Sequence, residues 1–321
     1  MRVRFWGTRG SLPVAPRADV FRRKVARALV AADGRRFADE AEAWDFAGSE
    51  LDFATGRGYG GATSCVEVEG APDGSFIVCD MGSGLRDFGL DAARRCAAGH
   101  ARIYNVFLSH LHWDHIMGFP FFVAAFDPGA TIVIHGGHAD LEKALRRQQE
   151  EISFPVAFDW LRADIRFRTL VPGETYRIAG MDVRLIEQCH SHASYGYRFE
   201  HDGKAVIYST DAEHRIDDME NERAFEAFFR GADVVVCDTM YSLAESVTMK
   251  ADWGHSSNLV AVDLCHAAGA DRLVLFHHEP TYVDEDIQRM HAETIRYEEI
   301  NRQDRPPLTV VCAYDGLELD V

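Results

Sequence analysis

The chain has 321 residues, of which 47% are hydrophobic and 26% charged, so it is long enough for one large globular domain with a sizeable core. Its formal net charge of −17 predicts repulsion of a long polyanion, which argues for a small anionic substrate and against a long nucleic acid as partner. The seven cysteines occur singly and no stretch approaches the roughly 18 apolar residues of a membrane span, so we expect no disulfide framework, no cysteine-built zinc site, no membrane contact and a cytoplasmic location.

Runs rich in β-branched residues, bounded by Gly, Asp or His, recur along the chain and predict strands. We expect strands at 2–7, 64–70, 75–82, 102–110, 131–136, 166–170, 182–190, 195–203, 204–211, 232–238, 271–278 and 307–321. Helical patterns fall at 85–98, 139–151, 221–231, 257–268 and 284–297. Helices that recur after strands predict an α/β fold, here as a single domain over residues 1–321.

Residues 17–58 separate the first two predicted strands and carry a helical pattern from about Val20 to Phe37. We interpret this segment as an insertion into the domain. An ordinary surface insertion is one interpretation, because loops absorb added residues without disturbing the core. A lid over the active site, or an arm that forms a homodimer, is the other.

A cluster of imidazole and carboxylate groups follows the predicted strand at 102–110. The run FLSHLHWDHIMGF places His110, His112, Asp114 and His115 within six residues. Borderline-soft divalent cations favour imidazole and carboxylate together, and this spacing is typical of metal ligands at the end of a strand. The cluster therefore predicts a metal site.

The motifs along the chain resemble, in the same order, those of the ribonuclease Z-like branch of the metallo-β-lactamase superfamily, which includes short phosphodiesterases such as the carbon–phosphorus lyase accessory phosphodiesterase. The similar stretches are FWGTRGSLPV, YGGATSCVEV, VCDMGSGL, FLSHLHWDH, CHSHASYGYRFE, YSTDAEH, CDTMYS, WGHSS and LVLFHHEP. They cover almost everything except residues 17–58. The resemblance implies a four-layer αββα sandwich with the metal site at one edge of its two sheets.

The same resemblance implies two divalent cations, with zinc preferred and manganese as the alternative. It assigns His110, His112 and His190 to the first cation, Asp114, His115 and His277 to the second, and Asp211 to a bridging position.

Two of these histidines have a competitor close by. His190 and His192 both lie in Cys-His-Ser-His, and the family places its ligand six residues before the glycine of Gly-Tyr-Arg, which favours His190. His277 and His278 are adjacent, and the ligand of this branch directly follows the strand, which favours His277.

The resemblance also assigns catalytic roles. His255 in WGHSS matches the general acid of ribonuclease Z-like enzymes and Asp238 matches the carboxylate that orients it, the alternative for His255 being a helix cap without a catalytic part. Asp114 counts as catalytic as well as a metal ligand, and Asp80 is expected to orient a ligand by a hydrogen bond. We predict a hydrolase in which a hydroxide that bridges the metals attacks the substrate while His255 protonates the leaving group.

These assignments predict a phosphodiesterase for a small cyclic or linear phosphodiester. Only 21 positions separate His190 from Asp211, where ribonuclease Z carries a tRNA-gripping arm, so tRNA processing is not expected. Two other functions stay open, namely hydrolysis of a lactone, thioester or β-lactam, and a non-hydrolytic di-metal sensor or binding protein. Iron-containing members of the superfamily usually carry Glu where His112 stands, which favours hydrolysis with zinc or manganese.

Overall fold

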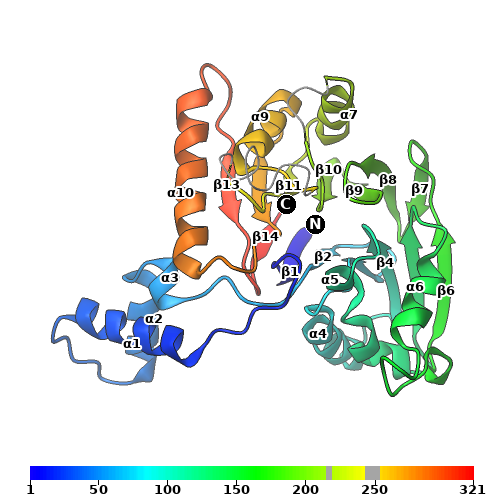
Figure 1. The fold of residues 1–321 in the computed structure, drawn as a ribbon, viewed down its shortest axis with the longest axis horizontal. Helices are drawn as coiled ribbons and strands as arrows, with labels where there is room; N and C mark the ends of the chain where they lie inside the picture. Colours follow the sequence, from blue (N-terminus) through cyan, green and yellow to red (C-terminus); the bar gives the residue numbers. More distant parts are fainter. Residues whose placement is uncertain (215–218, 243–253) are drawn as a thin grey trace.

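Two mixed sheets packed face to face form the centre of the molecule (Figure 1). The computed structural model describes residues 1–214, 219–242 and 254–321. The first sheet has the strand order β14-β1-β2-β3-β4-β5-β6 and the second has the order β13-β12-β11-β10-β9-β8-β7. In both sheets, antiparallel strands occupy one part and parallel strands the other.

The strands are short and follow the β-branched runs of the sequence. Those of the first sheet are β1 (Arg2–Gly7), β2 (Cys65–Glu69), β3 (Phe76–Cys79), β4 (Ile103–Leu108), β5 (Thr131–Gly136), β6 (Asp164–Thr169) and β14 (Glu318–Asp320). Those of the second are β7 (Thr175–Ile178), β8 (Met181–Gln188), β9 (Ser194–His201), β10 (Lys204–Ser209), β11 (Val234–Asp238), β12 (Arg272–Phe276) and β13 (Thr309–Cys312).

Helices cover the outer face of each sheet (Figure 1). The first sheet carries α4 (Leu85–Ala97), α5 (Trp113–Ile116) and α6 (Leu141–Gln148), with short 3-10 turns at Phe119–Phe121, Val123–Phe126 and Phe158–Trp160. The second carries α7 (Met219–Phe229), α9 (Asn258–Ala268) and α10 (Asp284–Asn301).

Three buried hydrophobic clusters match the three contacts between these layers. One lies between the sheets and includes Phe5, Phe107 and Phe276. A second joins the first sheet to its helices, and a third joins the second sheet to α7, α9 and α10. The predicted four-layer αββα sandwich is therefore confirmed.

The structure differs from the sequence prediction mainly at short elements. The four-residue strand β7 was not predicted, and the expected closing strand at 307–321 is two strands, β13 and β14. A turn with Gly316 at φ +94° separates them, which sends β13 to one sheet and β14 to the other. The hairpin at Asp202-Gly203 forms as expected, with φ of +49° and +72°, which suits a two-residue turn.

The segment 17–58 forms three helices, α1 (Ala18–Ala32), α2 (Glu40–Ser49) and α3 (Phe53–Gly56). The first helix ends five residues before the predicted end because Asp33 adopts a left-handed conformation, and none of its residues is buried. Lys24 anchors it, with Nζ 2.5 Å from an Asp284 carboxylate oxygen at the start of α10. The role of the segment 17–58 as a lid or a dimer arm stays a prediction. Among the described residues, no helix is long and apolar enough to cross a membrane.

Candidate metal centre

The predicted site residues gather at one edge of the two sheets. His110 follows β4, Asp211 follows β10 and His277 directly follows β12, while Asp238 ends β11. These are parallel strands, so their carboxyl ends meet at the same edge. The sandwich then brings the edge of one sheet against the edge of the other.

A first group consists of three imidazoles, those of His110, His112 and His190, whose donor atoms lie within 4.8 Å of one another. His190 Nε2 is 3.3 Å from His112 Nδ1. Both His110 Nε2 and His190 Nε2 are 3.7 Å from Oδ2 of Asp211. The carboxylate thus completes a four-donor set.

A second group consists of Asp114, His115, Asp211 and His277, all four of them buried. His115 Nε2 lies 3.1 Å from Asp114 Oδ2 and 3.2 Å from Asp211 Oδ1. His277 Nε2 lies 3.4 Å from the same Asp114 oxygen and 3.2 Å from the same Asp211 oxygen. These four donors face one point.

Asp211 is the residue that joins the two groups. Its Oδ1 belongs to the second group and its Oδ2 to the first. The backbone there is left-handed, with φ +48°, and Thr210 Oγ1 donates to Oδ1 at 2.7 Å. His277 and Asp80 are left-handed too, with φ +64° and +61°. Such conformations are sparsely populated and tend to gather at functional sites.

The two groups fit divalent cations. Four donors at 2.0–2.1 Å from a tetrahedral zinc are about 3.3–3.4 Å apart, which lies within the range of the separations above. The buried Nε2 atom of His110 has no hydrogen-bond partner, a rare condition in a folded protein. Burial lowers the pKa of His110, His112 and His190, which keeps these imidazoles neutral with a lone pair to offer.

Asp80 holds His115 in place. Its Oδ2 accepts from His115 Nδ1 at 2.7 Å and from the Tyr208 hydroxyl, also at 2.7 Å. Ser109 donates its backbone N–H to Oδ1 and its hydroxyl to Oδ2, both at 2.8 Å. A carboxylate bonded to Nδ1 fixes the imidazole so that Nε2 faces a cation. This is the position that the sequence predicts for Asp80.

The structure brings His190 and His277 into the cluster rather than their neighbours. His190 Nδ1 donates to the Gly254 carbonyl at 2.8 Å, whereas His192 is exposed, with its ring centroid 6.3 Å from that of His112. His278 is buried elsewhere and donates from Nε2 to the Ala313 carbonyl at 2.8 Å.

His255 and Asp238 form a pair beside the two groups. His255 Nδ1 is 2.6 Å from Asp238 Oδ2, and the His255 ring lies 5.2 Å from that of His190 and 5.1 Å from that of His277. Burial lowers the pKa of His255, but Asp238 outweighs burial and raises it to about 9. The imidazole is therefore a proton donor at neutral pH. Trp253 of the same motif lies outside the described residues.

Three backbone contacts of the site were not predicted. Ser11 donates its N–H to Asp114 Oδ2 at 2.8 Å, and a Cβ on Gly10 would lie 2.6 Å from the His277 ring. A Cβ on Gly254 would lie 2.4 Å from His190 Nδ1. Gly10 and Ser11 lie in the stretch FWGTRGSLPV, but a glycine or an N–H group has no chemical signature in a sequence that would reveal such a role.

A family model described as "Beta-lactamase superfamily domain" matches residues 76–278, more than half of the chain. The chain belongs to this superfamily. Its relatives include ribonuclease Z of Exiguobacterium sibiricum, 24% identical over 237 residues, which are 60% of this chain and 76% of that protein. Ribonuclease Z of Lacticaseibacillus casei is 26% identical over 296 residues, with 72% and 88% covered. The fold is similar to the short form of human tRNase Z, with a TM-score of 0.60 at 17% identity over 100% of this chain and 99% of that one.

This member of the superfamily is a metal-dependent hydrolase that uses divalent cations, as the sequence predicts.

The prediction that excluded a long nucleic acid as partner is wrong. The matched relatives carry the name ribonuclease Z, and the similar fold is that of a tRNase. The net charge of −17 describes the mean field of the whole surface, whereas a substrate meets the local charge of one site. The short spacing between His190 and Asp211 says only that this chain lacks room for an arm at that point.

Proposed function

We propose that this chain is a dinuclear phosphodiesterase with zinc as its metal and RNA among its substrates. The observation that carries the proposal is the His255–Asp238 pair beside a cluster that Asp211 divides into two donor sets. The names of the ribonuclease Z relatives support the choice of RNA.

The proposed ligands are the seven residues of the two donor groups, namely His110, His112, His190, Asp211, Asp114, His115 and His277. When bound, two divalent cations lower the pKa of a shared water and stabilise negative charge on the phosphate oxygens. Asp114 and Asp211 offset two of the four positive charges, so the site keeps a positive charge that attracts a phosphate to an acidic protein.

His255 has the remaining role in this mechanism. The leaving oxygen of a phosphodiester needs a proton, and an imidazole with a raised pKa holds one at neutral pH. Asp238 fixes the ring through Nδ1, and the Met240 N–H donates to its other oxygen at 3.0 Å. A donor atom of His255 lies within 4.8 Å of those of His190 and Asp211, so a phosphate held at the cluster would lie in reach of the proton.

Metal analysis combined with a substrate panel tests the proposal. We expect two zinc ions per chain and turnover of bis-p-nitrophenyl phosphate, cyclic nucleotides or a short RNA, but not of nitrocefin or lactones. Turnover of the carbonyl substrates alone would replace the proposal by a carbonyl hydrolase, and a bound iron with no hydrolysis would replace it by a sensor.

The substitution His255→Ala tests the role of the pair. We expect turnover to fall by about 10²–10⁴-fold with metal content unchanged, because a general acid contributes about that much. His192→Ala, which removes an exposed imidazole near the cluster, is the control and should change neither quantity. Full activity in His255→Ala would remove the general acid from the mechanism.

A further inference from the structure

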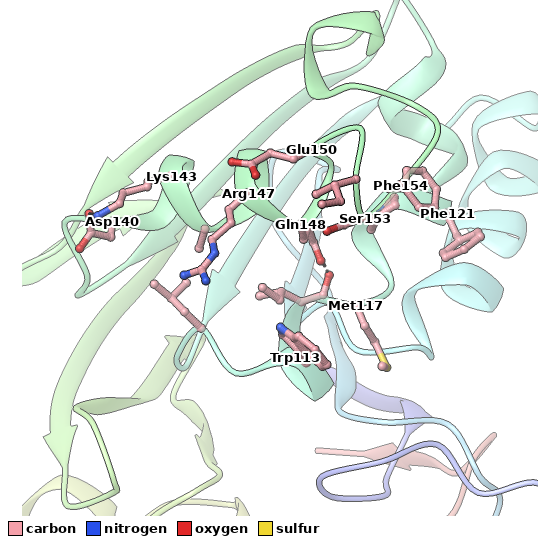
Figure 2. A pocket seen from close by; sticks show the side chains of 15 residues that line it. Trp113, Met117, Phe121, Asp140, Lys143, Arg147, Gln148, Glu150, Ser153 and Phe154 are labelled. Atoms are coloured by element: carbon pink, nitrogen blue, oxygen red, sulfur yellow. Dashed lines mark hydrogen bonds and ion pairs between the residues drawn. The ribbon is translucent and has the colours of Figure 1, made fainter.

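Residues of the loop after β4, of α6 and of the segment after α6 line a groove of about 840 Å³ (Figure 2). Leu111 and Trp113 form part of its wall, and they alternate along the chain with His112 and Asp114 of the two donor groups. The same loop therefore supplies ligands to the cluster and side chains to the groove wall, which places the groove next to the loop that carries His112 and Asp114.

Aromatic side chains of the groove lie uncovered. Trp113 is 79% exposed and Phe121 is 56% exposed. An indole that is exposed to water loses the stabilisation that burial gives. Exposed apolar groups that gather at one place mark binding surfaces. Trp113 opens α5, so neighbours that bind metal would hold its backbone in position.

A cation lies on the same side of the groove. Arg147 of α6 is exposed and forms no ion pair with any residue of 1–214, 219–242 or 254–321, whereas Lys143 pairs with Asp140 at 3.4 Å. Figure 2 shows the Arg147 guanidinium on the side of Trp113, with the Glu150 carboxylate on the far side of Arg147. Trp113 and Arg147 line the same groove, so one ligand could meet both an exposed indole and an unpaired guanidinium in a chain whose net charge is −17.

We propose that this groove binds a nucleotide of an unpaired RNA strand next to the bond that is cleaved, with its base on Trp113 and its phosphate on Arg147. The proposal rests on the phosphodiesterase function given above. Nucleotides of a single strand offer a base face and a phosphate together, and proteins bind them by aromatic stacking beside basic groups. An apolar peptide would offer Arg147 only neutral carbonyl oxygens, whereas a nucleotide offers a charged phosphate, which argues for the nucleotide.

The test measures binding of a fluorescent 2′-O-methyl oligouridine to the metal-loaded protein by anisotropy. We expect Trp113→Ala and Arg147→Ala each to weaken binding about tenfold, which is the effect of losing one stacked base. Trp44→Ala removes an indole that is 77% exposed on α2, far from the groove in sequence, and should bind as the wild type does. Unchanged binding in Trp113→Ala, or an equal loss in Trp44→Ala, would overturn the proposal.

Trp113→Phe separates stacking from damage to the loop. It keeps a ring at the same backbone position, so we expect binding within about threefold of the wild type and full metal content. Loss of binding in Trp113→Phe with metals retained would contradict a stacking role. Raised salt should weaken binding less in Arg147→Ala than in the wild type, because one phosphate contact is gone.

Hydrolysis of methyl p-nitrophenyl phosphate by the wild type separates this proposal from the function on which it rests. If this small ester is cleaved but the oligouridine does not bind, the groove proposal fails and the phosphodiesterase stands. If the oligouridine binds through Trp113 and no phosphodiester is cleaved, the proposed function fails and the groove remains a nucleotide site.

Discussion

The two sheets deliver their parts of the metal centre in different ways. The first sheet contributes one loop, in which His110, His112, Asp114 and His115 lie within six residues. The second contributes His190, Asp211 and His277, which follow three separate strands. One half of the centre is therefore local in the sequence and the other half depends on how distant strands align.

This difference predicts where the centre is vulnerable. The four donors of the loop after β4 lie within six residues, so the backbone conformation of that loop alone sets their relative positions. The donors of the second sheet are set by strand register, in which β10 pairs with β11 and β11 with β12, and by single backbone contacts such as the Gly254 carbonyl. Substitutions of residues that are not ligands themselves, but that hold the ligands of the second sheet in place, should therefore weaken metal binding.

The largest effect is expected for Asp211→Ala. This change removes one donor from each group at once, so we expect metal content to fall from two ions per chain to one or none. Turnover should fall by about 10³-fold or more, because the site would lose both the activation of water and the stabilisation of charge on the phosphate oxygens. Metal analysis after gel filtration and a kcat measurement check this. Retention of two ions would show that Asp211 does not join the groups.

The next effect is expected for Gly254→Ala. Its φ of +80° disfavours a side chain, and the added Cβ would lie 2.4 Å from His190 Nδ1, so the imidazole must leave its position. We expect loss of about one metal ion per chain. Gly34→Ala is the matched control, with φ +75° and nothing within 4 Å of the added atom. It should cost about 1 kcal/mol in unfolding free energy and no metal. Equal metal loss in both variants would assign the effect to backbone strain.

A smaller effect is expected for Asp80→Asn, which acts on the first half. The amide keeps the size of the carboxylate but is a weaker partner for His115 Nδ1 and for the Tyr208 hydroxyl. Support of this kind is worth about 10–100-fold in metal affinity. Competition with a chromogenic chelator measures the affinity. An unchanged metal affinity would mean that the loop positions His115 without help from Asp80.

The smallest effect is a release of protons when metal binds. Burial lowers the pKa of His115, but Asp114, Asp211 and Asp80 outweigh burial and raise it well above its ordinary value, so the metal-free site holds a proton on Nε2. A cation must displace that proton. Calorimetric titration of metal-free protein at pH 7, in buffers of different ionisation enthalpy, should show about one proton released per chain. The release should fall as pH rises through the pKa of His115, and a heat independent of buffer would contradict it.

Much of the fold was predictable because strand and helix patterns are local. The β-branched runs located β1 to β6 and β8 to β12 within a few residues. The four residues of β7 are too few for such a pattern, and the split of the closing segment depends on which sheet edges are open to β13 and β14. The charge of the whole chain gave a wrong answer about nucleic acid, because a sum over the surface says little about one groove.

The sequence by itself determined the chemical types of the centre, since four donors within six residues and the order of the other motifs are readable in one dimension. The family spacing already favoured His190 and His277 over His192 and His278, but only the tertiary structure decided that the two oxygens of Asp211 face different groups. The physical reason is that a donor atom must lie within a few tenths of an ångström of its place. Distances of that kind between strands come from register, backbone conformation and close contacts at glycines, which no run of side chains encodes alone.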